Sequence, residues 1–132
     1  MRPKALLFDV FGTVVDWRSG LIRDLSAHFQ RFPSTLDPAL VADAWRAEYQ
    51  PAMAPIRDGL RPFTKLDVLH RENLLKISAD LQFDLGDEDD IDWLVHAWHR
   101  LPAWPDSVSG INALKRLAIC ASQSNGHIAL AV

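Results

Sequence analysis

The sequence predicts an α/β protein in which two strands of a parallel sheet are separated by a long helical insert. Three observations support this class. A short apolar run near the N-terminus ends in a glycine turn, the segment after it carries apolar residues at helical spacing, and a second apolar run occupies residues 117–122. The length of 132 residues is close to the lower limit for a complete α/β domain.

The first run extends from Lys4 to Val10 and is followed by the turn Phe11-Gly12-Thr13. An apolar run of this length, broken within only by Asp9, is typical of a strand that is buried on both faces. We therefore expect residues 4–10 to form the central strand of a parallel sheet. Asp9 and the lack of a small-residue cleavage site argue against a signal peptide.

Apolar residues then recur every three or four positions, and breakers separate the expected helices. We place these helices at residues 19–32, 38–56, 62–81 and 87–101. Ser19 and Asp37 are the expected N-caps of the first two helices, and Pro51 and Pro55 are expected to break or kink the end of the second. The acidic cluster 87–90 fits a helix N-terminus and has no expected catalytic role.

The C-terminal part follows a cluster of prolines. We expect a short helix at 107–115, a strand at 117–122, a turn at 124–126 and a helix from 127 to 132. The polar residues at 121–123 weaken the predicted strand.

Composition restricts the kind of partner. The net charge is −3 and the basic residues are dispersed, which argues against a nucleic-acid groove or an anionic membrane surface. No apolar stretch approaches the roughly 20 residues that span a bilayer. Cys120 is the single cysteine, so one chain can form neither a disulfide nor a cysteine-based metal site. We expect a small-molecule ligand and a cytoplasmic location.

Asp9 is the first candidate for chemistry. Open α/β sheets bind ligands at the carboxyl ends of their strands, where Asp9 is expected, and we expect N–H groups of the Gly12-Thr13 turn to point toward the same place. The alternative is that Asp9 only caps the turn.

Residues 8–13, Phe-Asp-Val-Phe-Gly-Thr, resemble the first motif of the haloacid dehalogenase superfamily, and Ser124-Asn125 after the second strand resembles the second motif. The insert between them has the size of that superfamily's cap domain. Residues 8–18 and Ala44-Trp45-Arg46 resemble in particular the 2-haloacid dehalogenase branch. The resemblance implies a partial Rossmann-like core formed by residues 1–17 and 104–132, with a helical cap at 18–103.

Phe11 helps to choose the reaction. Phosphatases of this superfamily carry a second aspartate at this position, where it protonates the leaving alkoxide. A halide leaves without a proton, so Phe11 favours carbon–halogen cleavage over phosphoryl transfer. A phosphatase-like hydrolase is the alternative enzyme, and a non-catalytic interaction module is the alternative of another class.

The resemblance implies hydrolysis of short 2-haloalkanoic acids to 2-hydroxy acids through an ester on Asp9. Arg46 would stabilise the halide and the substrate charge, Ser124 would bind the substrate carboxylate, Asn125 would donate on the halide side, and Thr13 would orient Asp9. Each has a simpler interpretation: a surface arginine for Arg46, turn or cap residues for Ser124 and Asn125, and a turn hydroxyl for Thr13.

No metal or other cofactor is implied. The five histidines show no metal-ligand spacing with nearby acids, and Trp93, Trp98 and Trp104 are expected to pack in a core.

The superfamily's third motif, a lysine, and its fourth, an acidic motif, would follow the position of Val132. We therefore expect a C-terminally truncated core with impaired activity, in which the first strand exposes unpaired edges and apolar surface. A fragment, a truncated gene product, a subunit completed by another chain and a homodimer all fit this expectation.

Overall fold

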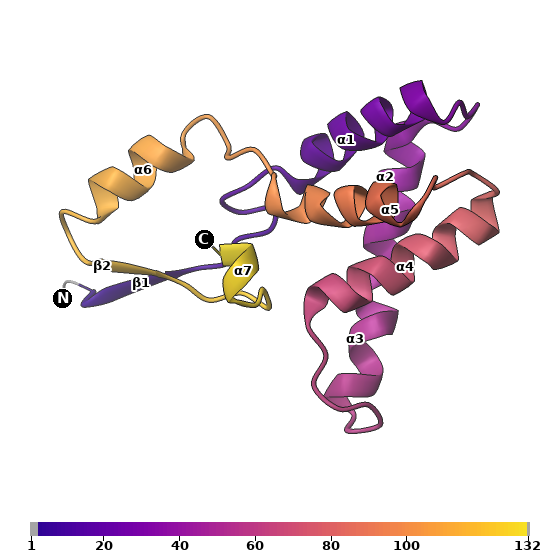
Figure 1. Cartoon of the computed structure of the whole chain (residues 1–132). Coiled ribbons are helices and arrows are strands. Elements are labelled where there is room, and N and C mark those ends of the chain that lie inside the picture. Colours follow the sequence, from indigo (N-terminus) through magenta and orange to yellow (C-terminus); the bar gives the residue numbers. More distant parts are fainter. Residues whose placement is uncertain (1–2, 132) are drawn as a thin grey trace.

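A computed structural model describes residues 3–131 and shows a helical lobe beside a smaller sheet lobe (Figure 1). The helical lobe contains α1 (Trp17–Arg31), α2 (Pro38–Ala47), α3 (Tyr49–Arg57), α4 (Leu66–Leu81), α5 (Glu88–Val95) and the 3-10 helix η1 (His96–His99). The sheet lobe contains β1 (Ala5–Phe8), α6 (Ser107–Leu114), β2 (Ile119–Ser122) and α7 (Ile128–Ala131). The predicted α/β class and order of elements are confirmed.

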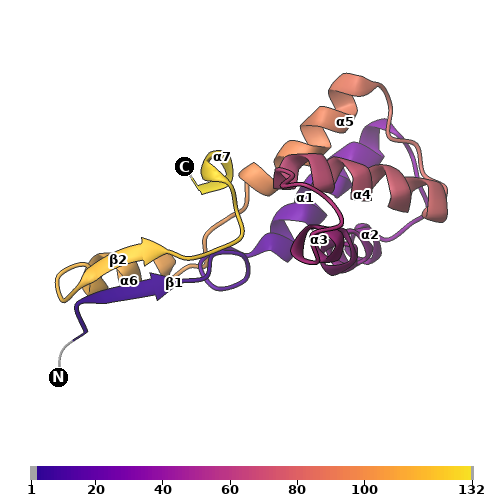
Figure 2. The same cartoon turned by 90° about the horizontal axis from the view of Figure 1, so that it is seen from below.

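The two strands are parallel, as predicted. Ala5 pairs with Ile119 and Phe8 with Ser122, so the carboxyl ends of both strands lie at one edge. That edge faces the helical lobe (Figure 2). The Gln123 N–H donates to the Phe8 carbonyl at 2.7 Å, which continues the pairing through the polar residues that weakened the prediction of this strand.

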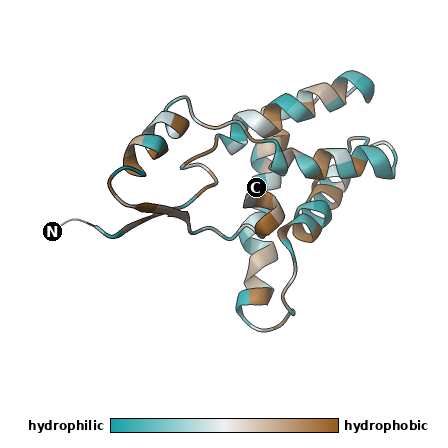
Figure 3. Cartoon of the chain, turned by 60° about the vertical axis from the view of Figure 1, so that its left-hand side comes forward, coloured by the Kyte–Doolittle hydropathy of each residue, from teal (hydrophilic) through white to brown (hydrophobic). Residues whose placement is uncertain are grey.

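The prediction that the first strand is buried on both faces is wrong for the described part of the chain. Burial alternates along β1, with Leu7 61% exposed, and Ile119 of β2 is 70% exposed. Figure 3 shows both strands as strongly hydrophobic. Within residues 3–131, α6 packs beside β2 whereas α7 contacts η1, so apolar strand surface stays uncovered, in agreement with the expected exposed edge.

The hydrophobic core lies in the helical lobe. Its buried members are Leu21, Leu25, Val41, Ala42, Trp45, Leu74, Ile77, Phe83, Leu85, Ile91, Leu94, Val95, Ala97 and Trp98. Trp45 is fully enclosed, and its Nε1–H donates to the His70 carbonyl at 3.0 Å. None of the helices in residues 3–131 is long and apolar enough to cross a membrane.

The first helix begins earlier than predicted, because Asp16 rather than Ser19 is its N-cap. The Asp16 carboxylate accepts a hydrogen bond from the Ser19 N–H at 3.0 Å, which places Ser19 in the first turn as the donor. The carboxylate satisfies a helix N–H that has no partner within the helix.

The predicted helix at 38–56 is two helices that meet at Glu48. Asp37 caps α2 as predicted. Pro51 has no N–H to donate to the Ala47 carbonyl, and its ring crowds that carbonyl, so the break falls four residues before the proline. Pro55 lies inside the last turn of α3, which ends two residues later at Arg57.

The remaining boundaries shift by a few residues. α4 starts at Leu66 rather than at 62, and Lys65 directly before it has an extended backbone. The predicted helix at 87–101 is α5 followed by η1. The acidic cluster opens α5 as predicted, with a capping box between Asp87 and Asp90. The last predicted helix starts at Ile128, and Val132 lies outside the described residues.

The two lobes are joined through the turn that follows β1. The Asp16 N–H donates to the Pro102 carbonyl at 2.8 Å, and the Trp104 N–H to the Val14 carbonyl at 3.1 Å. Gly12 has φ +97°, a conformation that favours glycine. The turn after β1 is therefore hydrogen-bonded to residues 102–104, where the chain returns from the helical lobe toward β2.

Candidate active site

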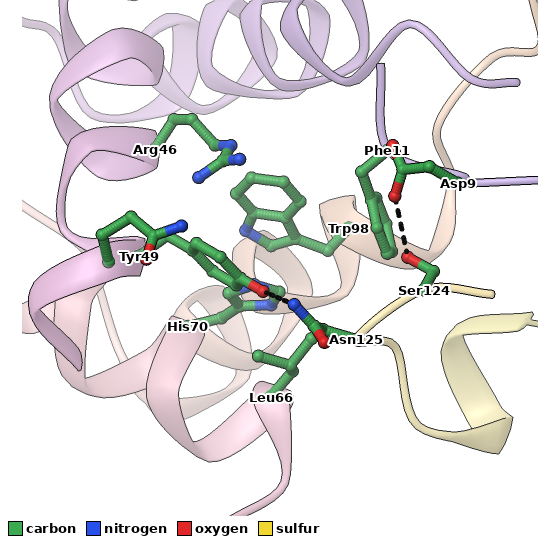
Figure 4. A pocket seen from close by; sticks show the side chains of 10 residues that line it. Asp9, Phe11, Arg46, Tyr49, Leu66, His70, Trp98, Ser124 and Asn125 are labelled. Atoms are coloured by element: carbon green, nitrogen blue, oxygen red, sulfur yellow. Dashed lines mark hydrogen bonds between the residues drawn. The ribbon is translucent and has the colours of Figure 1, made fainter. Parts of the chain in front are cut away.

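Asp9 directly follows β1, and Ser124 comes two residues after β2, so the parallel pairing brings both to one edge. The Thr13 hydroxyl donates to Asp9 Oδ2 at 3.2 Å and the Ser124 hydroxyl to Oδ1 at 3.5 Å (Figure 4). Each carboxylate oxygen therefore accepts one hydroxyl hydrogen bond. The carboxylate of Asp9 forms no ion pair within residues 3–131.

The turn after β1 does not supply the backbone donors that we expected. The Gly12 N–H donates to the Val15 carbonyl at 2.9 Å, and the Thr13 N–H donates to the Val10 carbonyl at 3.2 Å. Both groups are consumed inside the turn, since a tight turn satisfies its own polar groups. Side-chain hydroxyls, rather than these backbone groups, orient Asp9.

A cavity of about 190 Å³ opens at this edge. Its lining residues are Asp9, Phe11, Arg46, Tyr49, Gln50, Leu66, His70, Trp98, Ser124 and Asn125. This volume lies below the ~300–1,000 Å³ of pockets for drug-sized ligands, so the cavity fits a small molecule. Every predicted site residue lines the cavity except Thr13, whose hydroxyl donates to Asp9 Oδ2.

Arg46 on α2 lies across the cavity from Asp9 (Figure 4). Its guanidinium lies 4.6 Å from the ring centroid of Tyr49 and 5.8 Å from that of Trp17. No carboxylate pairs with Arg46 among residues 3–131. Aromatic faces hold the cation without neutralising it, so its charge is available to an anionic ligand.

Asn125 and Tyr49 connect the two lobes. The Asn125 amide donates to the Tyr49 hydroxyl at 2.7 Å (Figure 4). The turn after β2 therefore sends Ser124 toward Asp9 and Asn125 toward α3. Tyr49 is a site residue that was not predicted from the sequence, because its hydroxyl meets Asn125 only through the packing of α3 against the turn after β2.

Aromatic rings form the apolar wall of the cavity. Phe11 and Trp98 meet edge to face, with centroids 6.3 Å apart. Trp98 is buried in the core, as predicted, and also lines the cavity. Trp104 and Trp93 are instead partly exposed: Trp104 donates to the Gly12 carbonyl, and Trp93 lies under Arg100.

His70 is a cavity residue that the sequence analysis did not select. Its ring stacks on Trp98 with centroids 4.4 Å apart, and burial lowers the pKa of His70 from 6.5 to about 3. The ring is therefore neutral near pH 7. The buried atoms His70 Nδ1 and Trp98 Nε1 have no hydrogen-bond partner among residues 3–131. A lone histidine on a helix gives no sequence signal for such a position.

The buried neutral His70 predicts that acid destabilises the fold. Between about pH 3 and 6.5 the unfolded chain binds a proton that the folded chain excludes, so stability rises with pH in this window. At pH 5 we expect a loss of roughly 2 kcal/mol relative to neutral pH. Urea unfolding at both pH values, compared with His70→Gln, measures it. Equal pH dependence in the two proteins would show that folded His70 accepts a proton.

A group able to bind a metal ion lies outside the cavity. Asp67, His99 and His127 each offer a ligand atom, and these atoms lie within 4.8 Å of one another. No metal site was expected here, because these residues are far apart in the sequence.

Comparison with known proteins gave matches only among solved structures. No protein-family model and no curated protein sequence matches the chain. The defluorinating L-2-haloacid dehalogenase Rha0230 is 44% identical, with a TM-score of 0.92, over 96% of this chain and 53% of its own. The L-2-haloacid dehalogenase PA0810 is 43% identical, with a TM-score of 0.88, over 99% and 55%.

A more distant structure, the L-2-haloacid dehalogenase of Xanthobacter autotrophicus, is 23% identical with a TM-score of 0.78 and supports the fold alone. Fold and motifs together define a protein of the haloacid dehalogenase-like class. The chain belongs to the haloacid dehalogenase-like superfamily, and both solved chains that are more than 40% identical to it are L-2-haloacid dehalogenases. It spans about half the length of the solved chains that it matches.

Proposed function

We propose that this chain supplies the nucleophile and the cationic wall of a 2-haloacid dehalogenase, which hydrolyses short 2-haloalkanoic acids to 2-hydroxy acids. One observation carries the proposal. The Asp9 carboxylate and the unneutralised Arg46 guanidinium face one small cavity, and Phe11 occupies the position of a phosphatase's general acid.

In the first step an Asp9 carboxylate oxygen attacks C2 of the substrate. The new carbon–oxygen bond forms as the carbon–halogen bond breaks, and the halide leaves with the bonding electrons. Arg46 stabilises the departing anion, and Asn125 donates on the same side. The Phe11 and Trp98 rings exclude water from the reacting carbon. The Ser124 hydroxyl has one hydrogen, so it turns from Asp9 Oδ1 to donate to the substrate carboxylate.

In the second step water attacks the carbonyl carbon of the Asp9 ester. The ester bond breaks, the 2-hydroxy acid leaves, and a proton is released as the Asp9 carboxylate is restored. Thr13 keeps this carboxylate oriented through both steps, since its hydroxyl contacts Oδ2.

The proposed domain organisation assigns residues 18–103 to a cap and residues 1–17 and 104–132 to the core domain. The enclosed hydrophobic cluster within α1 to η1 supports an independent cap. The substrate cavity then lies where cap and core meet, which is a common position for ligand sites.

The proposed partner is a small acid in the cytoplasm, in keeping with dispersed charge and a single cysteine. The exposed apolar residues Leu7 and Ile119 also support pairing of the sheet with another chain, for which a homodimer is one candidate.

Similar solved structures guide the choice of substrates. The Xanthobacter enzyme has been solved with chloropropionic acid covalently bound, and Rha0230 is described as defluorinating. The test is therefore halide release from (S)-2-chloropropionate and from fluoroacetate. It uses the 132-residue chain and a version extended by the C-terminal half of an L-2-haloacid dehalogenase.

The expected result is chloride release by the extended chain, with weak or no release by the short one. A single turnover in ¹⁸O water should label the Asp9 carboxylate, because water attacks the ester carbonyl. Release of phosphate from p-nitrophenyl phosphate with Mg²⁺, without halide release, would reject the dehalogenase and favour the phosphatase.

Replacement of Arg46 by lysine should lower turnover by roughly 10²-fold, because a point charge cannot reproduce the planar cation stacked near Tyr49 and Trp17. Steady-state halide release measures this loss. The matched control is Arg57→Lys, a change at an exposed arginine outside the cavity. Turnover unchanged in Arg46→Lys would exclude a role for the guanidinium in halide departure.

A further inference from the structure

Three side chains that the proposed reaction does not use meet where the helical lobe approaches α7 (Figure 2). Asp67 lies in the first turn of α4, His99 ends η1, and His127 directly precedes α7. His99 Nε2 lies 2.9 Å from Asp67 Oδ1, and His127 Nε2 lies 3.1 Å from Asp67 Oδ2. All three residues are partly buried.

Both ring nitrogens of His99 face oxygen atoms that can accept a hydrogen bond, whereas a neutral imidazole has one N–H to donate. Its Nδ1 lies 3.0 Å from the Ala129 carbonyl oxygen, which can only accept, so Nδ1 carries the proton. Nε2 then faces the Asp67 carboxylate, which is also an acceptor. A neutral imidazole has one N–H, so the arrangement needs either a protonated ring or a cation shared by Nε2 and the carboxylate.

The hydrogen bond from His99 to a backbone carbonyl is itself typical of metal-binding histidines. Such a bond fixes the tautomer and directs the other ring nitrogen at the ion. In Asp67, His99 and His127 the donor set is two imidazole nitrogens and one carboxylate oxygen. This set suits zinc and its first-row neighbours, whereas Mg²⁺ and Ca²⁺ prefer oxygen ligands.

The spacing of the ligand atoms also fits. In a tetrahedral site with bonds of about 2.0–2.1 Å, neighbouring ligand atoms lie about 3.3 Å apart. The two histidine nitrogens contact different oxygens of Asp67, at 2.9 and 3.1 Å, and the three ligand atoms that one ion would share all lie within 4.8 Å of one another. The three ligands leave a fourth position for water.

We propose that Asp67, His99 and His127 bind one divalent first-row transition-metal ion, with Zn²⁺ as the probe. The ion joins α4 and η1 to the segment after β2, and His127 directly follows the turn that carries Ser124 and Asn125. Binding therefore fastens this turn to the helical lobe. The site does not depend on the proposed dehalogenase reaction.

The test uses the tag-free 132-residue chain, stripped with a chelator. Calorimetric titration with Zn²⁺ should give one ion per chain, and Co²⁺ should develop the intense visible bands of a tetrahedral site that Zn²⁺ then removes. His99→Gln and His127→Gln should each weaken Zn²⁺ binding by at least roughly 100-fold, because loss of a ligand exceeds the cost of losing an outer partner.

His96→Gln is the matched control: His96 lies exposed on η1, its Nδ1 contacts the Asp92 carbonyl, and its ring packs 5.0 Å from that of His99 without offering a ligand atom to the group. It should keep the wild-type affinity, and circular dichroism should show that each variant is folded. X-ray absorption of the zinc-loaded wild type, which needs no variant, should show imidazole scattering. If the wild type gave neither a calorimetric signal with Zn²⁺ nor the visible Co²⁺ bands, the proposal would be overturned. Equal affinity in His127→Gln would also overturn it.

Discussion

Asp9→Asn should reduce halide release from (S)-2-chloropropionate by roughly 10⁴-fold or more, because the amide cannot attack C2 as a carboxylate does. The substitution preserves the size of the side chain and leaves an oxygen that can accept from Thr13 or Ser124. Folding should therefore be unchanged. Chloride release is measured in whichever of the short and extended chains is active, and mass spectrometry should show no ester on the variant.

The matched control is Asp106→Asn, which makes the same change in charge at an exposed aspartate outside the cavity. This variant should release halide at the wild-type rate. If Asp9→Asn kept more than a few per cent of the activity, the ester mechanism would be rejected, and attack by water directly on C2 would be the alternative.

The location of Asp9 and Ser124 could be predicted from local sequence, because each residue follows the carboxyl end of a strand. The apolar run placed Asp9 at the end of β1, and the second run placed Ser124 at the end of β2. Parallel pairing then brings the two residues together, as found. The same reasoning did not predict that the N–H groups of Gly12 and Thr13 donate to carbonyls of their own turn. Those hydrogen bonds depend on the path of the backbone around Gly12.

The predicted helix boundaries were wrong where two residues close together could each begin or end the helix. Asp16 and Ser19 are both residue types that cap helices, and in the structure the Asp16 carboxylate is the N-cap. Pro51 was recognised as a breaker, but its effect falls on the carbonyl four residues earlier, so the break comes at Glu48.

Residues that meet only through tertiary packing gave no sequence signal. His70 becomes a cavity residue because α4 packs its ring on Trp98 of η1. Asp67 and His99 are separated by 32 positions, and they meet because α4 and η1 lie together. Spacing rules for metal ligands detect pairs on one helix or in one loop, so they could not detect this pair.

Trp45→Ala should lower the free energy of unfolding by about 3–5 kcal/mol, the usual cost of truncating a buried tryptophan. Trp45 is 1% exposed and meets Trp98 edge to face, with centroids 5.7 Å apart. The loss is a large part of the ~5–15 kcal/mol that stabilises a typical domain. Urea unfolding followed by circular dichroism measures it.

Trp45→Phe separates the two contributions of this side chain, because it keeps an aromatic ring in the core and removes the hydrogen bond to the His70 carbonyl. We expect an intermediate loss, which remains measurable even if Trp45→Ala does not fold. Trp93→Ala is the control, since Trp93 is 41% exposed, and its loss should stay within about 1 kcal/mol. Equal losses in Trp45→Ala and Trp93→Ala would contradict a core centred on the helical lobe. A larger loss at Trp45 would mean that the buried cluster of the helical lobe stabilises α2, which holds Arg46 opposite Asp9.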